Sequence, residues 1–129
     1  MLLHISEQAS ETLQEQIIDQ IRARILSGAL LADTALPSIR SLAKDLRVSV
    51  ITVQRAYDAL LNEDLIYSRR GKGFFVAYLP GDDKSALAGA RFGDRLTKLI
   101  KEAKREGLSS TEIERLFNDA LKSGDENNA

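Results

Sequence analysis

The fold is decided by residues 36–79, which read LPSIRSLAKDLRVSVITVQRAYDALLNEDLIYSRRGKGFFVAYL. Apolar residues recur at helical spacing in the first part of this stretch, and aromatic and β-branched residues dominate its end. Ser38 and Ser49 each stand directly before a helical pattern, where a hydroxyl can cap the free backbone N–H groups. We therefore expect two short helices, over 39–46 and from 50 to 62 or 63, joined by a tight turn.

A β-hairpin is expected directly after the second of these helices. Its strands are Leu65–Ser68 and Phe74–Tyr78, and the turn between them is Arg69-Arg70-Gly71-Lys72-Gly73. A further amphipathic helix is expected before the quoted stretch, over residues 11–27. Two helices joined by a tight turn form a helix-turn-helix, and a hairpin that follows the second helix is a wing. The sequence therefore predicts a winged helix-turn-helix.

More helix is expected after the hairpin. Pro80-Gly81-Asp82-Asp83 interrupts the pattern, and an amphipathic helix over 84–106 is predicted beyond it, although two glycines weaken its first turns. Ser109 and Glu112 have the spacing of a capping box, in which each side chain bonds the other's backbone N–H. A second amphipathic helix is therefore expected to begin there.

The expected fold is mainly α with a small β-hairpin. We divide the chain into a winged helix-turn-helix DNA-binding domain, residues 1–79, and a short helical C-terminal dimerisation region, residues 80–129. The composition of residues 1–9 and 124–129 suggests that both ends fray.

The composition limits the class of protein. The 129 residues include no cysteine, which excludes disulfides and thiolate metal sites. Apolar runs are far shorter than the roughly 20 residues that cross a bilayer. His4 is the only histidine, and no carboxylate cluster has metal-ligand spacing. We expect a cytoplasmic protein without a membrane span, metal, cofactor or catalytic group.

Charge is distributed unevenly along the chain. The whole sequence carries 18 basic and 19 acidic residues, for a net charge of −1, whereas nucleic-acid-binding proteins are usually basic. Residues 36–79 alone contain seven Lys and Arg against four Asp and Glu. Phosphate contact depends on this local excess of positive charge rather than on the total.

The second helix of a helix-turn-helix presents its N-terminal residues to base edges in the major groove. Gln54 can pair with adenine, and Val50 or Ile51 can pack on a thymine methyl group. Arg40 and Arg55 are better placed for phosphates. The alternative is that Gln54 and Arg55 only solvate the exposed face of a core helix. The candidate DNA contacts of the helices are Ser38, Arg40, Ser49, Val50, Ile51, Thr52, Gln54 and Arg55.

The hairpin turn is the second candidate for DNA contact. Arg69, Arg70 and Lys72 place three cations on it, and Gly71 permits a positive φ and a close backbone approach. These features suit a phosphate or the minor groove, and they equally suit the tip of an ordinary soluble hairpin. The turn is no P-loop, because it joins two strands and lacks the motif's spacing.

The run from Ile25 to Val76, ILSGALLADTALPSIRSLAKDLRVSVITVQRAYDALLNEDLIYSRRGKGFFV, resembles the DNA-binding domain of the GntR family of transcription regulators. The short tail resembles the YtrA-like subfamily in length and helical character. This resemblance implies a homodimer on a palindromic operator, usually a repressor of its own operon, often with ABC transporter genes. It implies DNA contact at Arg40, at Ser49–Gln54 and at Arg70-Gly71.

Two positions depart from the family's pattern. Val50 stands where the family usually has arginine, so that a guanine contact is lost and the operator is expected to differ. Asp64 stands where a glycine usually follows Glu63, and it must therefore adopt the geometry of that helix end.

The two C-terminal helices would expose apolar faces in a monomer. We expect them to pair across a two-fold axis, which would space the recognition helices by one DNA turn, about 34–36 Å. The alternative is that they fold back on their own domain. The expected interface residues are Leu96, Leu99, Ile100, Ile113, Leu116, Phe117 and Leu121.

Two other functions remain open at this point. One is a ligand-gated sensor with its effector at the C-terminal helices, although two helices are not expected to enclose a pocket of about 300 Å³. The other is a protein-interaction module built on a winged helix, since a fold does not fix a function. An enzyme is disfavoured because no nucleophile and base can be paired.

Overall fold

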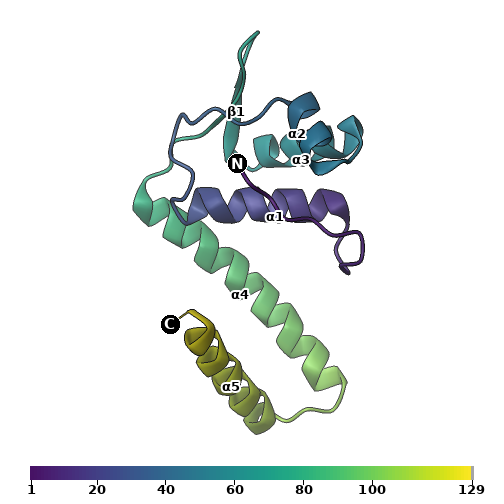
Figure 1. The fold of residues 1–129 in the computed structure, drawn as a ribbon. Helices are drawn as coiled ribbons and strands as arrows, with labels where there is room; N and C mark the ends of the chain where they lie inside the picture. Colours follow the sequence, from purple (N-terminus) through teal and green to yellow (C-terminus); the bar gives the residue numbers. More distant parts are fainter. Residues whose placement is uncertain (129) are drawn as a thin grey trace. The chain divides into compact units, whose positions relative to one another are not determined.

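The computed structural model describes residues 1–128 (Figure 1), and the expected fraying of the chain end at Ala129 lies outside them. The fold is mainly helical, with a two-stranded antiparallel hairpin followed by two C-terminal helices, which confirms the expected fold class. The elements in chain order are α1 (Leu13–Leu26), α2 (Ile39–Leu46), α3 (Val50–Asn62), β1 (Ile66–Arg69), β2 (Gly73–Val76), α4 (Gly81–Arg105) and α5 (Ser110–Asn128).

The helices of the first part begin where the sequence places their caps. Ser38 and Ser49 cap α2 and α3 by accepting the backbone N–H three residues further on. At α1, Thr12 and Glu15 form a complete capping box, with Glu15 N donating to Thr12 Oγ1 at 3.1 Å and Thr12 N to the Glu15 carboxylate at 3.3 Å. Side-chain oxygens thus satisfy backbone donors that have no partner within the helix.

Two helix ends use the left-handed conformation without glycine. Arg47, which ends α2, has a φ of 57°, and Asp64, after α3, has a φ of 58°. The expectation that Asp64 takes up this geometry is confirmed. The Arg47 backbone turns the chain so that Val48 N donates to Ala43 O at 3.0 Å, which closes the turn between α2 and α3.

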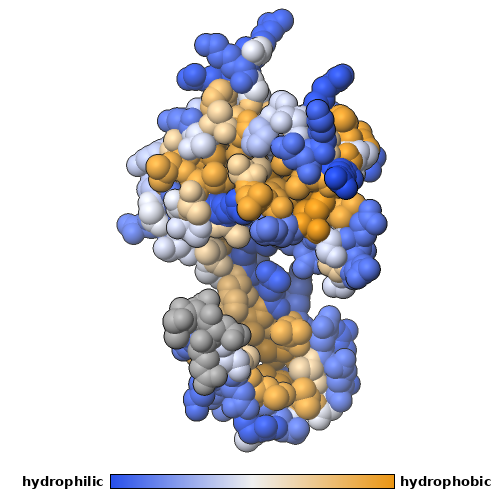
Figure 2. All heavy atoms as spheres, in the orientation of Figure 1, coloured by the Kyte–Doolittle hydropathy of each residue, from blue (hydrophilic) through white to orange (hydrophobic). Residues whose placement is uncertain are grey.

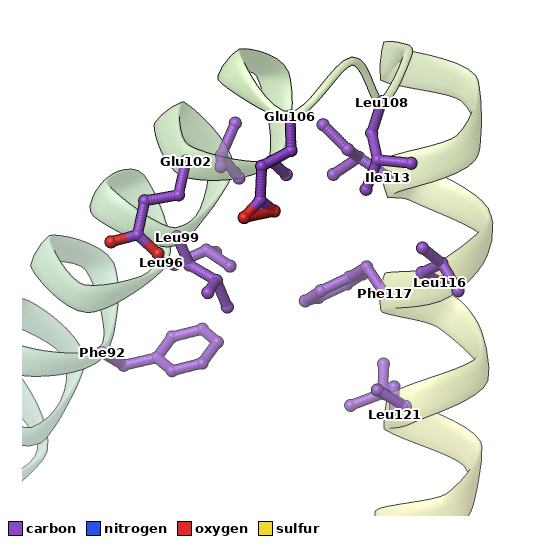
Figure 3. Close-up of a pocket in the computed structure, with 13 residues that line it drawn as sticks. Phe92, Leu96, Leu99, Glu102, Glu106, Leu108, Ile113, Leu116, Phe117 and Leu121 are labelled. Carbon is purple, nitrogen blue, oxygen red and sulfur yellow. The ribbon is translucent and has the colours of Figure 1, made fainter.

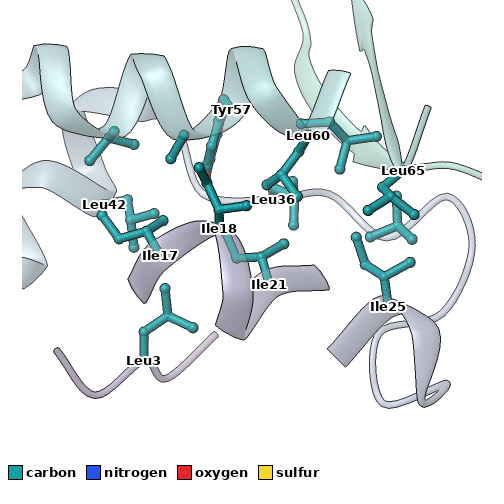
Figure 4. Packing of buried hydrophobic residues seen from close by; sticks show 14 of the residues in the cluster. Leu3, Ile17, Ile18, Ile21, Ile25, Leu36, Leu42, Tyr57, Leu60 and Leu65 are labelled. Atoms are coloured by element: carbon teal, nitrogen blue, oxygen red, sulfur yellow. The ribbon is translucent and has the colours of Figure 1, made fainter. Parts of the chain in front are cut away.

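One hydrophobic core lies between α1 and the two helices of the helix-turn-helix (Figure 4). Ile17, Ile21 and Ile25 of α1 are fully buried against α3. Tyr57 of α3 is also fully buried, and its hydroxyl donates to Pro37 O at 2.7 Å. Burial raises the pKa of Tyr57, because the phenolate would lose its hydration. The core thereby fixes α3 relative to the start of α2.

The wing is broader than the sequence suggests. In the hairpin, Ile66 pairs with Val76 at one end and Arg69 with Gly73 at the other. The first strand therefore begins one residue later than expected. Residues 33–36, between α1 and α2, run beside β2: Val76 N donates to Thr34 O and Leu36 N to Phe74 O, both at 2.9 Å. This third segment, which the sequence analysis missed, ties the hairpin to the domain.

The N-terminal segment packs against α1, where the sequence suggested a frayed end. Leu3 is only 6% exposed and belongs to the core. The Gln16 side-chain amide bonds both the N–H and the C=O of Ser6, and Gln20 does the same for His4. Two glutamines of α1 therefore hold the preceding segment by satisfying its backbone groups.

The described chain divides into two compact units, Met1–Leu87 and the residues from Ala88 onward, whereas the sequence analysis placed the division after residue 79. In the second unit, α4 continues through Gly89 and Gly93, and α5 continues to Asn128, where the sequence suggested a frayed tail. None of the described helices is long and apolar enough to cross a membrane.

Candidate nucleic-acid interface

The helix α3 has one face in the core and one in solvent. Val53, Ala56, Tyr57 and Leu60 are fully buried, whereas Gln54, Arg55 and Asp58 on the opposite side are exposed. Val50 and Ile51, in the first turn, are 47% and 51% exposed. Gln54 and Arg55 are exposed one turn later, on the same side, because residues three and four apart share a helix face. The outer face of α3 therefore presents the expected recognition residues to solvent.

The hydroxyl candidates have local bonds. Thr52 N donates to Ser49 Oγ at 3.2 Å, and the Ser49 and Thr52 hydroxyls lie 2.7 Å apart. Ser38 likewise accepts from Ser41 N at 3.1 Å. The first role of these three side chains is therefore to begin helices, and any contact with DNA would be made in addition.

The cations at the helices are available for anions. Arg40 at the start of α2 and Arg55 on α3 are exposed. Within the described part of the chain, ion pairs within 4.0 Å join Arg22 to Asp19 and to Glu63. Neither Arg40 nor Arg55 takes part in these pairs, and each can offer a full positive charge to a phosphate.

The three cations of the wing differ in their contacts. Arg69 lies over the Phe75 ring, 5.6 Å from its centroid, and Phe75 in turn stacks on Tyr67 at 5.6 Å. Arg70 and Lys72 lie at the exposed turn, which is closed by Lys72 N donating to Arg69 O at 2.9 Å. Cation–π contact restrains Arg69, whereas the two turn cations remain free of ring contacts in the described structure.

The turn depends on glycine. Gly71 has a φ of 75° and Gly73 a φ of 97°, a region that residues with a Cβ seldom occupy. The Tyr67 hydroxyl donates to Asp33 Oδ1 at 2.6 Å, which joins the wing to the segment between α1 and α2. This hydrogen bond raises the pKa of Tyr67. The wing is thus held at its base and exposed at its tip.

Arg22 is a structural partner of the recognition helix that the sequence analysis missed. It is 9% exposed, and its Nε and one terminal nitrogen donate to the two Glu63 oxygens at 2.9 and 2.7 Å. The other terminal nitrogen donates to Asp19 at 2.7 Å. The hydrogen bonds with Glu63 raise the pKa of Arg22. A signal was present in the sequence, since Arg22 follows Ile18 by one helical turn on the buried face of α1.

The second unit contains an apolar groove between α4 and α5, with a volume of about 560 Å³ (Figure 3). Apolar side chains from the two helices point toward one another across it, and Figure 2 shows the corresponding apolar surface. No residue of α4 is buried. The two helices thus form an open groove, whereas the sequence led us to expect that they would not enclose a pocket of about 300 Å³. The groove includes every expected interface residue: Leu96, Leu99, Ile100, Ile113, Leu116, Phe117 and Leu121.

A helix-turn-helix followed directly by a wing defines the winged helix-turn-helix class of DNA-binding proteins. The profile described as "Bacterial regulatory proteins, gntR family" matches residues 13–76. The repressor YtrA of Bacillus subtilis is 30% identical, over 89% of this chain and 86% of YtrA. The chain belongs to the GntR family, and it is a DNA-binding transcriptional regulator.

Other relatives are much longer than this chain. The probable rhizopine catabolism regulatory protein MocR of Rhizobium meliloti is 45% identical over 66% of the chain, which spans 17% of MocR. The repressor NagR of Bacillus subtilis is 36% identical over 83% of the chain, which spans 41% of NagR. The chain therefore corresponds to less than half the length of each of these relatives.

Solved structures support the same assignment. A GntR family regulator from Listeria monocytogenes superposes with a TM-score of 0.71 at 26% identity, covering 89% of this chain and 98% of that one. The DNA-binding domain of AraR, solved in complex with the operator ORE1, has a TM-score of 0.50 at 27% identity and covers 60% of this chain and 94% of that one.

Proposed function

We propose that this protein is a homodimeric repressor that recognises a palindromic operator through the first turns of α3 and through the tip of the wing. The observation that carries the proposal is the outer face of α3, where Val50, Ile51, Gln54 and Arg55 are exposed together. The AraR domain with a similar fold was solved with an operator bound, which supports this use of the fold.

The proposed contacts divide by chemistry. Gln54 reads adenine through its side-chain amide, and Val50 and Ile51 contact the base edges beside it. Arg40 and Arg55 bind phosphates beside the major groove. Phosphate contacts give affinity and register, and base contacts give sequence preference.

The wing supplies the remaining contacts in this proposal. Arg70 and Lys72 bind the phosphates or the minor groove next to the helix site, and Gly71 lets the backbone approach closely. Arg69, held against Phe75, adds positive charge at the edge of the same surface. The local excess of cations in residues 36–79 supports this assignment in a chain whose net charge is −1.

The dimer is proposed to form through the groove of the second unit. Leu99 is 61% exposed and Leu121 is 56% exposed, and both line the groove together with Phe117. A second copy of the chain would cover these side chains with its own α4 and α5. Pairing would bury apolar surface that costs free energy in water, and two-fold symmetry would match a palindromic operator.

Membership of the family supports a proposal for the biological setting. We propose that the protein acts in the cytoplasm, where it represses its own operon, and that this operon includes ABC transporter genes. Expression of the genes downstream of its promoter should rise when the gene that encodes this protein is deleted. Unchanged transcript levels would contradict control of its own operon.

The test of the proposed function is fluorescence anisotropy on the protein's own upstream promoter DNA and on a scrambled duplex. Gln54→Ala is expected to cost about 1–3 kcal/mol on the promoter and to reduce selectivity. Arg40→Ala is expected to weaken both complexes and to lower the slope of log Kd against log salt by about 0.9. Lys122→Ala, an exposed change on α5, serves as the matched control. Equal binding to both duplexes by the unaltered protein would overturn the proposal.

A ligand-gated regulator is the second candidate, because the groove has the volume of a small-molecule site, about 300–1,000 Å³. Its lining is apolar except for Glu102 and Glu106. The test is a thermal-shift screen of small apolar metabolites followed by operator titration. A compound that raises Tm and changes operator affinity would support gating, and the absence of any such compound would count against it.

A further inference from the structure

The first turn of α3 carries two exposed apolar side chains that the fold does not use. Val50 and Ile51 are adjacent and about half exposed, and neither belongs to the core or packs against it. Single exposed apolar residues are common on protein surfaces. Here two stand together at the turn of the helix that meets base edges in this class of fold.

The polar side chains of the same turn are already engaged. Ser49 caps the helix, and its hydroxyl lies 2.7 Å from that of Thr52, whose backbone N–H it also accepts. Gln54 and Arg55 follow one turn later. The first turn of the helix therefore offers methyl groups at its surface, while hydrogen-bonding capacity lies further along the helix.

We infer that Val50 and Ile51 read the C5-methyl groups of pyrimidines in the major groove, so that the DNA site of this protein is defined at those positions by methyl contact rather than by a hydrogen bond. The inference rests on the proposed function and specifies its ligand. Thymine displays this methyl group in the major groove, and unmodified cytosine does not. A 5-methylcytosine displays it at the same place on the ring.

The expected effect is modest and measurable. Removing one buried methyl group from an interface changes Kd by about four-fold at 25 °C. A palindromic site presents the same position twice, so that the effect of changing both half-sites is about sixteen-fold when the two contacts are independent.

The experiment uses the full chain and a DNA site selected by it from a pool of randomised duplexes. Each thymidine of the selected site is replaced by deoxyuridine, which removes only the methyl group. At one or two positions in each half-site, we expect Kd to rise by about four-fold per methyl. At the same positions, 5-methylcytosine is expected to bind more tightly than cytosine.

Protein variants locate the contact. Val50→Ser and Ile51→Ser each remove the apolar surface at an exposed position, and circular dichroism checks that both variants fold. At least one is expected to bind the thymidine and deoxyuridine duplexes equally. Leu31→Ser, at an apolar residue that is 68% exposed and lies outside α3, is the matched control and should keep the four-fold ratio. Arg40→Ala should weaken both complexes and keep the ratio.

The outcomes separate the two proposals. The protein could bind its site selectively while no replacement of a thymidine by deoxyuridine changes Kd. That result would overturn the methyl inference and leave the proposed function in place. A ratio that persists in both Val50→Ser and Ile51→Ser would also overturn it, because the methyl contact would then lie elsewhere. Failure to select any sequence would overturn the proposed function and the inference together.

Discussion

At the scale of single residues, Arg22 connects α1 to the end of the recognition helix. Its guanidinium donates to both Glu63 oxygens and to Asp19, and Glu63 caps the end of α3. The planar guanidinium suits this bidentate contact, which lysine could not make. The arrangement places a charged network at the edge of a core that is otherwise apolar.

Replacing Arg22 tests what this network contributes. Arg22→Met keeps most of the apolar stem and removes three charged hydrogen bonds, and we expect a loss of about 2 kcal/mol in the free energy of unfolding. Asp19→Asn, at a half-exposed partner, is the control and should cost about 0.5 kcal/mol. Urea denaturation measures both changes. Equal effects of the two variants would show that the Glu63 contact adds little.

At the scale of elements, α5 begins with a capping box on the protein surface. The Ser109 hydroxyl and backbone N–H donate to one Glu112 oxygen at 2.9 and 3.3 Å, and Glu112 N donates back to Ser109 Oγ at 3.2 Å. These bonds hold the pKa of Glu112 below its ordinary value. The box satisfies backbone donors of the first turn and fixes where the helix begins.

The capping box predicts a pH dependence. The pKa of Glu112 is lower in the folded chain than in the unfolded chain. The ionised Glu112 carboxylate therefore stabilises the fold above the ordinary glutamate pKa of about 4.3, and this stabilisation is lost as the pH falls through the pKa of Glu112 in the folded chain. Ser109→Ala should raise the Glu112 pKa toward its ordinary value, as measured by ¹³C NMR titration of the carboxyl carbon. Ser110→Ala is the control, and an unchanged midpoint in Ser109→Ala would contradict the assigned cause.

At the scale of the whole molecule, the two units bury apolar surface differently. The first unit closes its core with α1, α3 and the N-terminal segment around Leu3. The second leaves an apolar groove open between α4 and α5. An exposed apolar groove of this kind commonly marks an interface.

The proposed dimer gives a direct prediction of mass. At micromolar concentration, the full chain is expected to sediment at about twice 14.2 kDa. Leu99→Lys places a charge in the groove and should yield a monomer, because an unpaired charge is costly to bury. Leu31→Ser should remain a dimer. A monomeric mass for the unaltered chain would rule out pairing through the groove.

Much of the fold could be predicted because its signals are local. The caps at Thr12, Ser38 and Ser49 lie within four residues of the groups that they bond, and the buried stripe of α3 recurs at helical spacing. The left-handed end at Asp64 also follows from its place after the helix. The candidate recognition residues could be named for the same reason, since the outer face of a helix follows from its buried face.

The features that the sequence analysis missed depend on residues far apart in the chain. Arg22 meets Glu63 across 41 positions, and the Tyr67 hydroxyl reaches Asp33 across 34. Leu3 belongs to the core, and Gln16 and Gln20 bond the backbone of the segment around it across 10 and 16 positions. Neither hydrophobic period nor capping pattern carries information about such distant partners.

The sequence by itself determined the order of the helices, their caps, the wing and the outward face of α3, because each follows from backbone hydrogen bonding and side-chain periodicity over a few residues. Only the tertiary structure decided the third segment of the wing, the docking of the N-terminus and the open groove between α4 and α5. These depend on which surfaces meet in space, and that is set by packing over the whole chain.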